Sequence, residues 1–317
     1  MNTIGVDLGG SHVLATIVDD EGKIIERAER DIVDRSADAA VDTIGKTIDD
    51  VRQRVKEKAT SIGLGSPGNI DLSTGTVKYS PNFGWRNVPL GERLRKRFDL
   101  PVFVANDARC ATLGEYTYGA GRGTKNFVLL TLGTGIGGGI VAEGKLIVGS
   151  SAVAGEIGHH QIRATDGFYC NCGKIGCFEA QASGTGLIRH ALAIKQSFPR
   201  SDLVSGSPAK LGSKSIRKAA EAGDPHGLAA WNRYTDDLAR GVANIITFVN
   251  PEMIALGGGV AGAGEFMLRP LRPKVDELTT MVSGDGTQII TASLGNDAGA
   301  IGAATMARRG GLTANAT

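Results

Sequence analysis

Three cysteines lie close together near the middle of the chain, at Cys170, Cys172 and Cys177. Two histidines, His159 and His160, precede them. Three thiolates and one imidazole form a common closed, tetrahedral site for structural zinc. Buried free thiols are the alternative, but such a cluster in a chain of 317 residues with four cysteines favours a metal site over a disulfide framework. The segment is therefore predicted to bind Zn²⁺.

Two carboxylates flank this segment. Glu156 lies three residues before His159, and Glu179 lies two residues after Cys177. A metal that fixes the segment would also hold both carboxylates and an imidazole in place, and such groups can hydrogen-bond the hydroxyls of a sugar. A solvated acidic surface is the other interpretation of each glutamate.

A candidate catalytic base ends an apolar segment. The sequence LPVFVAND predicts a buried strand with Asn106 and Asp107 at its carboxyl end, where α/β sheets present ligands. A carboxylate there could orient a hydroxyl and accept its proton during phosphoryl transfer. Asn and Asp are also preferred N-caps, and the following ARCATLGEY looks helical, so the pattern taken alone favours a capping role for Asp107.

Glycine is abundant, with 46 of 317 residues, and it gathers in three turns that follow apolar segments. These turns are DLGGS at 7–11, GTGIGGG at 133–139 and GGGVAG at 257–262. Without a Cβ, backbone N–H groups can approach a phosphate closely, although each turn could also be merely tight. The second turn contains G-x-G-x-x-G but continues as a strand, which excludes a Rossmann fingerprint, and a P-loop motif is absent. The three turns together predict a bound nucleotide, with Asp7 placed to hold Mg²⁺ through water.

The elements that must position these groups repeat along the chain. Residues 3–30 read as three short strands, and a helix with Ser36 as its N-cap follows them. Residues 126–146 repeat the opening pattern of strand, Leu-Gly, glycine turn, strand and Glu-Gly-Lys. The repeat predicts a duplicated α/β unit with a cleft between the copies, and chance similarity of two hairpins is the alternative.

The rest of the chain gives a coarser pattern. Helices are predicted over about 225–249 and in the closing AGAIGAATMARR, and a strand in MIALGGG. The Ser/Gly/Lys-rich segment 201–215 is predicted to be a loop.

Charge and hydropathy limit the class of function. The 35 Lys and Arg residues nearly balance the 33 Asp and Glu residues, which argues against a nucleic-acid or membrane-surface partner. No stretch approaches the roughly 18 apolar residues of a membrane span, and the start of the chain does not resemble a signal peptide. A cytoplasmic α/β protein is therefore expected.

With these motifs assembled, the chain resembles the ROK family (repressors, open reading frames and kinases), and within it the glucokinases. The resemblance runs over nearly the whole chain and is most specific in LGTGIGGGIVAEGKLIVGSSAVAGEIGH and CNCGKIGCFE. It implies an α/β, actin-like (ribonuclease H-like, hexokinase/Hsp70-type) two-domain ATPase fold with a central ligand cleft. The smaller domain would comprise 1–115 plus 298–317, and the larger one, 116–297, would carry the zinc loop.

The resemblance also implies an activity and its residues. ATP would phosphorylate the 6-hydroxyl of a hexose, glucose above all, with Asp107 as general base. The residues expected to bind the sugar are Asn82, Asn106, Asp107, Glu156, His159 and Glu179. Those expected at Mg-ATP are Asp7, Gly9, Gly10, Ser11, Gly133, Thr134, Gly135 and Gly258. The expected zinc ligands are His159, Cys170, Cys172 and Cys177.

Two departures from the family pattern affect the site. The first turn reads Gly9-Gly10-Ser11-His12 where family members have G-G-T-K, and a histidine is a weaker, pH-dependent substitute for lysine. Family members often place the ligand histidine ten residues before the first cysteine, which points to His160. The E-I-G-H frame points to His159, which we prefer.

Other activities are compatible with the same motifs. The acceptor could be mannose, N-acetylmannosamine or fructose, because acceptor choice depends on small differences in pocket shape. Polyphosphate could replace ATP as donor, and a non-catalytic sugar sensor is possible. Family repressors carry a helix-turn-helix domain before the first glycine turn, and because six residues precede Asp7 we expect no such module. The expected partners are a sugar and ATP, with no nucleic acid or membrane, in a homodimer or homotetramer.

Overall fold

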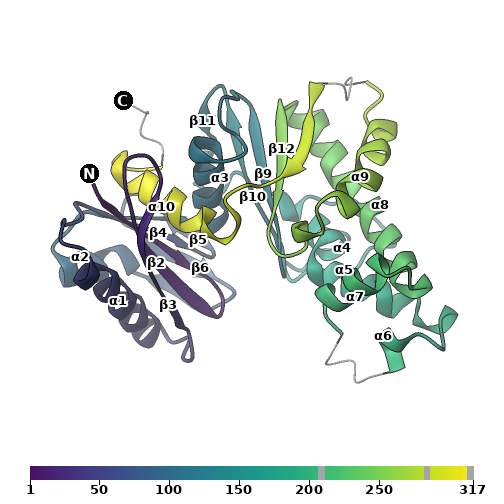
Figure 1. Cartoon of the computed structure of the whole chain (residues 1–317), viewed down its shortest axis with the longest axis horizontal. Helices are drawn as coiled ribbons and strands as arrows, with labels where there is room; N and C mark the ends of the chain where they lie inside the picture. The colour runs from purple at the N-terminus through teal and green to yellow at the C-terminus, as the bar shows by residue number, and fades with distance from the viewer. Residues whose placement is uncertain (206–210, 282–285, 313–317) are drawn as a thin grey trace. The chain divides into compact units, whose positions relative to one another are not determined.

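The computed structural model describes residues 1–205, 211–281 and 286–312 (Figure 1). Its contacts group the described residues into two compact units. The first comprises 1–125, 139–155 and the described part of 293–317, and the second comprises 126–138 with the described part of 156–292. The domain boundaries expected from the sequence, at 115/116 and 297/298, stay a prediction.

The first unit is built on a five-stranded sheet in the order β3-β2-β1-β4-β8. Its strands are β1 (Thr3–Leu8), β2 (His12–Val18), β3 (Ile24–Asp31), β4 (Ile62–Ser66) and β8 (Val102–Asn106). The first three form the expected antiparallel meander, whereas β4 and β8 run parallel to β1. A smaller sheet contains β5 (Asn69–Asp71), β6 (Thr76–Ser80) and β7 (Trp85–Val88).

Four helices accompany this sheet: α1 (Ala37–Arg54), α2 (Leu90–Phe98), α3 (Asp107–Tyr118) and α10 (Ala298–Arg308), the last preceded by η6 (Gly295–Asp297). The Ser36 side chain accepts a hydrogen bond from the Ala39 N–H and caps α1, as predicted. Helix α10 consists mainly of small residues because it lies directly against backbone. A Cβ at Gly302 would collide with the Cys110 carbonyl of α3.

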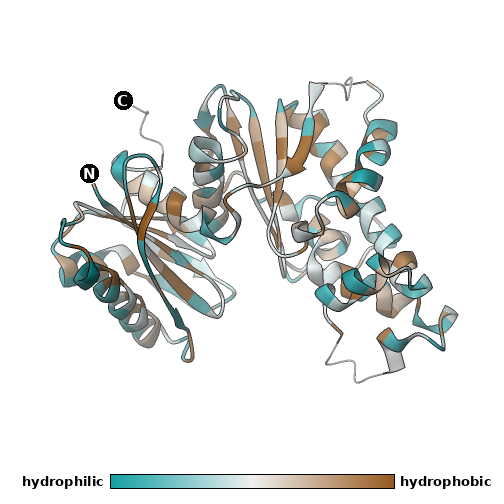
Figure 2. Cartoon of the chain, in the orientation of Figure 1, coloured by the Kyte–Doolittle hydropathy of each residue, from teal (hydrophilic) through white to brown (hydrophobic). Residues whose placement is uncertain are grey.

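A second five-stranded sheet has the order β11-β10-β9-β12-β13. Its strands are β9 (Phe127–Leu132), β10 (Ile136–Ala142), β11 (Lys145–Leu146), β12 (Met253–Gly257) and β13 (Gln288–Thr291), and the division between the units falls within β10. Strands β1 and β9 have the same length and the same pattern of burial, in which only the fifth residue is partly exposed. The matching strand orders support the duplicated unit predicted from the sequence. Figure 2 shows hydrophobic residues along β9, β10 and β12, consistent with their burial.

The other helices of the described residues lie in the second unit. They are η1 (Ile157–His159), α4 (Phe178–Ala182), α5 (Gly184–Ala193), η2 (Lys195–Ser197), α6 (Asp202–Ser205), α7 (Ser213–Glu221), α8 (Pro225–Val249), η4 (Ala261–Ala263) and α9 (Glu265–Leu278). Helix α8 has the predicted bounds. The loop predicted over 201–215 is partly wrong, because α6 and α7 occupy both of its ends, and residues 206–210 lie outside the described part. Ile216 and Ala220 supply the buried face that stabilises α7.

None of the helices among the described residues has the length and apolar character that crossing a bilayer requires.

Candidate active site and metal centre

The first sheet brings two carboxylates to one edge. Asp7 near the end of β1 pairs in register with Gly65 of β4, and Ser66 pairs with Asn106 of β8. Because β1, β4 and β8 are parallel, their carboxyl ends meet, and Asp107 follows directly after β8. A Cβ at Gly65 would lie 3.2 Å from the Asp107 Cα, so glycine provides room for the chain to turn there.

The cap of α3 is Asn106. Its side-chain oxygen accepts the Arg109 N–H at 3.2 Å. Asp107 is the first residue of the helix, where its Oδ1 accepts the Ala108 N–H at 2.9 Å. The capping role that the pattern favoured for Asp107 is therefore wrong, because the preceding residue fills it. The Asp107 carboxylate instead sits at the helix N-terminus, where the dipole favours a negative charge.

Asp7 is held in surroundings that disfavour its charge. Burial and, secondarily, the charge of Asp107 raise the pKa of Asp7 to about 7. The first turn of α10 covers this carboxyl so closely that a Cβ at Gly299 would lie 2.6 Å from the Asp7 Cγ. Two carboxylates that repel each other at the end of a sheet form a site that a divalent cation would stabilise.

The first glycine turn is open. The Gly9 N–H donates to the His12 carbonyl at 2.9 Å and closes the hairpin. A Cβ at Gly10 would meet no atom within 4 Å, so the backbone there faces space. The Ser11 hydroxyl lies 3.4 Å from His12 Nδ1, and His12 Nε2 lies 3.9 Å from Glu29. His12 is thus exposed and paired locally within the hairpin.

In the second unit the other two glycine turns meet at the end of β9. The Gly133 N–H donates to the Gly135 carbonyl at 3.0 Å, and the Val260 N–H donates to the Leu132 carbonyl at 3.0 Å. Gly258 has a φ of +84°, and a Cβ there would lie 2.7 Å from the Leu132 carbonyl oxygen. The structure therefore brings Gly258 to the turn at 133–135, and nucleotide binding by these glycines stays a prediction.

The start of α5 supports this turn, which sequence reasoning missed. The Gly184 N–H donates to the Gly133 carbonyl at 2.8 Å, and the Thr185 hydroxyl donates to the Thr134 carbonyl at 2.8 Å. Ser183 caps α5 through the Gly186 N–H at 3.1 Å. The signal in the sequence was S-G-T-G at 183–186, a helix start with two glycines.

Glu179 connects the glycine turn to the cysteine segment. Its Oε2 accepts the Ile136 N–H at 2.9 Å, and its Oε1 lies 3.9 Å from Cys170 Sγ. A Cβ at Gly135 would collide with the same carboxylate. A side chain at position 135 would therefore displace the Glu179 carboxylate from its hydrogen bond to Ile136, a relation that the sequence did not reveal.

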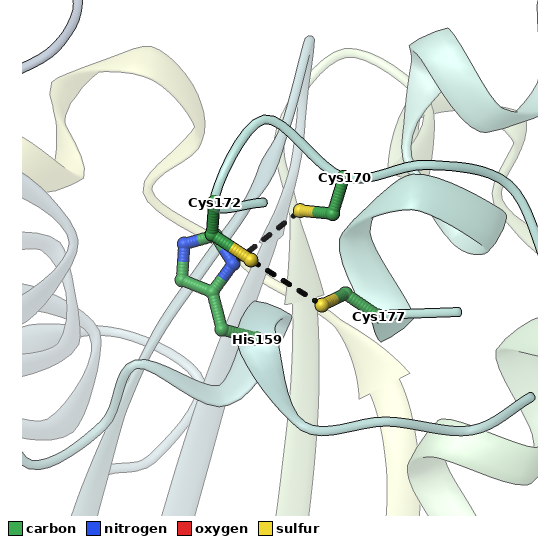
Figure 3. Close-up of side chains that lie close together, drawn as sticks. All are labelled: His159, Cys170, Cys172 and Cys177. Carbon is green, nitrogen blue, oxygen red and sulfur yellow. Dashed lines mark hydrogen bonds between the residues drawn. The ribbon is translucent and has the colours of Figure 1, made fainter. Parts of the chain in front are cut away.

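Four side chains converge in the cysteine segment, as Figure 3 shows. The ligand atoms of His159, Cys170, Cys172 and Cys177 all lie within 4.8 Å of one another. Cys172 Sγ is 3.5 Å from Cys177 Sγ, and Cys170 Sγ is 3.7 Å from His159 Nδ1. Ligand atoms around a tetrahedral zinc with Zn–S bonds of about 2.3 Å lie about 3.8 Å apart. The donor set and spacing fit a structural metal site.

Local turns hold these ligands. The Cys170 N–H donates to the Lys174 carbonyl at 2.8 Å, and Gly173 takes a φ of +90° in the tight turn between them. Lys174 Nζ donates to the His159 carbonyl at 2.9 Å. Burial, together with the neighbouring thiols, raises the pKa of Cys177 to about 12, so a bound cation would be needed to hold this ligand as a thiolate.

His160, the alternative ligand, does not join the cluster. Its Nδ1 lies 2.6 Å from the Ile157 carbonyl oxygen, and its ring packs against Phe178 with centroids 5.2 Å apart. The geometry therefore favours His159, the residue preferred from the E-I-G-H frame.

The predicted sugar-binding residues divide between the units, each of which is described by itself. Asn106 and Asp107 lie together in the first unit, where Asn82 is exposed and its carbonyl accepts Arg35 Nη1 at 3.4 Å. In the second unit Glu156 precedes η1, which ends at His159. Glu179 approaches the metal ligands in that unit through Cys170.

Comparisons with known proteins agree with this geometry. The model of the ROK family matches residues 3–310. A glucokinase of Thermotoga maritima is 42% identical over 314 residues, which cover 96% of this chain and 97% of that protein. A xylose repressor of Caldicellulosiruptor bescii is 31% identical over 280 residues, or 86% of this chain and 70% of that protein.

Solved structures of family members also resemble this chain. The crystal structure of a ROK family glucokinase from Streptomyces griseus, in complex with glucose and AMPPNP, superimposes with a TM-score of 0.86. The two chains are 35% identical, and the match covers 97% of this chain and 99% of the other. The predicted α/β, actin-like ATPase fold is confirmed by this likeness. From the family model and these relatives, the chain belongs to the ROK family.

Proposed function

We propose that this protein is an ATP-dependent glucokinase, which transfers the terminal phosphoryl group of Mg-ATP to the 6-hydroxyl of glucose. The observation that carries the proposal is the Asp7–Asp107 pair at the strand ends, in a chain that is 42% identical to a glucokinase over nearly its whole length. A ROK glucokinase that superimposes closely was crystallised with glucose and an ATP analogue, which supports both proposed substrates.

Asp107 is the proposed general base. Phosphoryl transfer to an alcohol needs a carboxylate that orients the hydroxyl and accepts its proton as the oxygen attacks the phosphorus. Asp107 extends from the first turn of α3, which fixes its backbone, and Asn106 holds that turn as the cap. Such a base contributes about 10²- to 10⁴-fold to the rate.

The donor is proposed to bind at the glycine turns. Gly9, Gly10 and Ser11 in the first unit offer open backbone and a hydroxyl. Gly133, Thr134, Gly135 and Gly258 offer a backbone surface in the second unit. Asp7 is the proposed partner of Mg²⁺ through water, and the ion supplies charge neutralisation on the phosphates.

The sugar is proposed to bind through Asn82, Asn106, Glu156, His159 and Glu179, alongside Asp107. The metal at His159 and the three cysteines is proposed to be Zn²⁺, because Cys₃His is its usual structural set and the spacing of the ligand atoms fits. That ion fixes the loop that carries the sugar-binding groups. Glu179 joins this loop to the turn at Ile136, so sugar and donor residues are linked within one unit.

The cellular setting follows from the same chemistry. Free thiol ligands and the need for ATP support the cytoplasmic location expected from the sequence. A homo-oligomer, a dimer or tetramer, and the domain boundaries at 115/116 and 297/298 complete the proposal.

An assay of ADP release tests the proposal. Mg-ATP is supplied with glucose, mannose, fructose or N-acetylmannosamine in turn. In a separate reaction inorganic polyphosphate replaces ATP, and the formation of glucose 6-phosphate from glucose is measured. We expect the highest kcat/KM with glucose and ATP, and a loss of at least about 10²-fold in Asp107→Asn with glucose binding still detectable by calorimetry. The exposed Asp99→Asn serves as control and should retain wild-type turnover.

Two results would contradict parts of the proposal. Near-wild-type turnover in Asp107→Asn would show that Asp107 is not the general base. Sugar binding without turnover with any acceptor or donor would favour a sensor, a function to which the 31% identity with a xylose repressor gives some support.

A further inference from the structure

A wholly buried carboxylate lies in the middle of α8 and is not among the residues of the proposed site. Asp237 has no exposed surface, which is rare for a charged side chain without a specific partner. Its Oδ1 accepts Arg163 Nε at 2.7 Å, and its Oδ2 lies 3.3 Å from His190 Nε2. Arg240 Nε, on the half-exposed side of the same helix, lies 3.8 Å from Oδ1.

Arg163 belongs to the loop that carries the metal ligands. It lies between His159 and Cys170 in the sequence, and its N–H donates to the Gly176 carbonyl at 3.2 Å. Gly176 directly precedes Cys177, has a φ of +74°, and would collide with the Arg163 carbonyl if it carried a Cβ. Arg163 is therefore fixed to the turn that delivers Cys177.

The second oxygen of Asp237 lies beside His190 of α5 and makes no hydrogen bond among the described residues. Nε2 of His190 lies 3.1 Å from the Gln181 carbonyl oxygen. The His190 ring packs edge-on against the Phe168 ring, with centroids 5.0 Å apart. Phe168 in turn packs against the buried thiols Cys170 and Cys177. One carboxylate thus has contacts leading to both cysteines, through the Arg163 guanidinium on one side and through the edge-on rings of His190 and Phe168 on the other.

The energetics make this arrangement more than incidental packing. A buried ion pair is costly to assemble, and removal of one partner leaves an uncompensated buried charge. Arg163 could pair with Asp166 alone, since its Nη1 already contacts that exposed carboxylate at 2.8 Å. The chain nevertheless holds Arg163 inward against Asp237, which ties the loop to α8.

We propose that Asp237 is a positioning residue for the metal centre: through Arg163 and His190 it holds the His159–Cys177 loop against α8 and α5 in the geometry that retains the metal. The inference rests on the proposed metal site. Asp237 does not contact the metal ligands and acts only through its partners. Loss of the contact loosens the loop, so metal escapes faster and the sugar-binding groups His159 and Glu179 lose their fixed positions.

The test compares two adjacent residues of α8. Asp237→Asn keeps the shape of the side chain and removes its charge, whereas Asp236→Asn is the matched control. Asp236 is half-exposed and pairs with Lys274 of α9 at 2.7 Å. Proteins loaded with Zn²⁺ are mixed with a chromophoric chelator, and release of the ion is followed by absorbance. We expect release about 10- to 100-fold faster from Asp237→Asn, and release at the wild-type rate from Asp236→Asn.

A kinetic readout separates positioning from general destabilisation. Asp237→Asn should raise the KM for glucose more than it raises the KM for ATP, because the loop carries the sugar-binding groups. Arg163→Lys provides a milder variant that keeps the positive charge but loses the Nε donor and the planar fork. It should show faster zinc release even if Asp237→Asn does not fold.

The outcomes are distinguishable. A wild-type protein that holds no stoichiometric zinc would overturn the metal site itself. Wild-type zinc with equal release from Asp237→Asn and Asp236→Asn would overturn the positioning role and leave the metal site intact. If Asp237→Asn cannot be purified folded, wild-type release from Arg163→Lys overturns it equally.

Discussion

The two five-stranded sheets share one order of strands but present different chemistry at corresponding places. In β1 the single partly exposed position is Asp7, and in β9 it is Thr131, in strands with the same pattern of burial. In the first sheet Asp107 directly follows β8, so the carboxyl ends of its parallel strands carry two carboxylates. The second sheet presents backbone turns at the same edge, supported by α5 and Glu179.

The difference shows how one scaffold serves two tasks. A parallel strand end offers a fixed point in space, and the residue that follows decides what is presented there. Acidic side chains suit a cation and a hydroxyl proton, whereas open glycine backbone suits phosphate oxygens. The duplicated sheets therefore complement each other chemically although they repeat structurally.

Among the variants that compare the two sheets, Asp7→Asn should have the largest effect on activity. Loss of the carboxylate at this strand end should lower kcat/KM for Mg-ATP by about 10²-fold, because one preorganised electrostatic partner of the metal is removed. Thr131→Ala, at the corresponding place in β9, is the control and should cost less than about threefold. Steady-state kinetics at varied Mg-ATP measure both. Equal losses in the two variants would show that the sheets do not divide the chemistry as described.

The same Asp7→Asn change should stabilise the protein when no metal or ligand is bound. Burial and the charge of Asp107 raise the pKa of Asp7 from 3.8 to about 7, so the unfolded state binds fewer protons than the folded state between these values. The contribution of the Asp7 carboxyl to wild-type stability is therefore fully present below pH 3.8 and is lost as pH rises through 7. The variant lacks this penalty.

Its gain in unfolding free energy should be on the order of 3 kcal/mol greater at pH 8 than at pH 5. Urea denaturation in the presence of EDTA at the two pH values measures the difference. A gain that does not depend on pH would mean that Asp7 titrates normally.

In the second unit, Cys172→Ala tests whether the cysteine segment holds a metal. Removal of one thiolate leaves three ligand residues, so the protein should lose stoichiometric zinc, and the KM for glucose should rise about tenfold. Elemental analysis and steady-state kinetics check this. Cys110→Ala is the control, since that buried thiol of α3 lies outside the cluster and its loss should leave the metal content unchanged. Full zinc content in Cys172→Ala would remove this residue from the site.

Glycine substitutions should give the smallest effects and separate two reasons for glycine. Gly258→Ala places a side chain at a φ of +84° against the Leu132 carbonyl, so it should cost about 1–3 kcal/mol of stability. Gly10→Ala meets no atom within 4 Å, so it should leave stability unchanged and raise the KM for ATP severalfold. Thermal melts and kinetics distinguish them. A Gly10→Ala protein with unaltered KM would exclude this turn from phosphate binding.

Much of this arrangement could be predicted because it depends on local sequence patterns. The bounds of α8, the cap at Ser36 and the two glycine hairpins follow from the spacing of apolar residues and turn residues. The cysteine cluster could be predicted from residue type and proximity in the chain, because its ligands lie within one short segment. The loop predicted at 201–215 is wrong at its end, where α7 begins at Ser213, because the buried residues Ile216 and Ala220 that follow stabilise this helix.

The sequence by itself determined the repeated strand–turn–strand units, the family and the set of polar groups available for chemistry. Only the tertiary structure decided which neighbour takes which role: Asn106 rather than Asp107 caps α3, and His159 rather than His160 faces the thiols. Asp236 and Asp237 are identical in type, yet one pairs at the surface and the other is buried against Arg163. The physical reason is that burial and partnership depend on contacts between segments far apart in the chain, which no local pattern records.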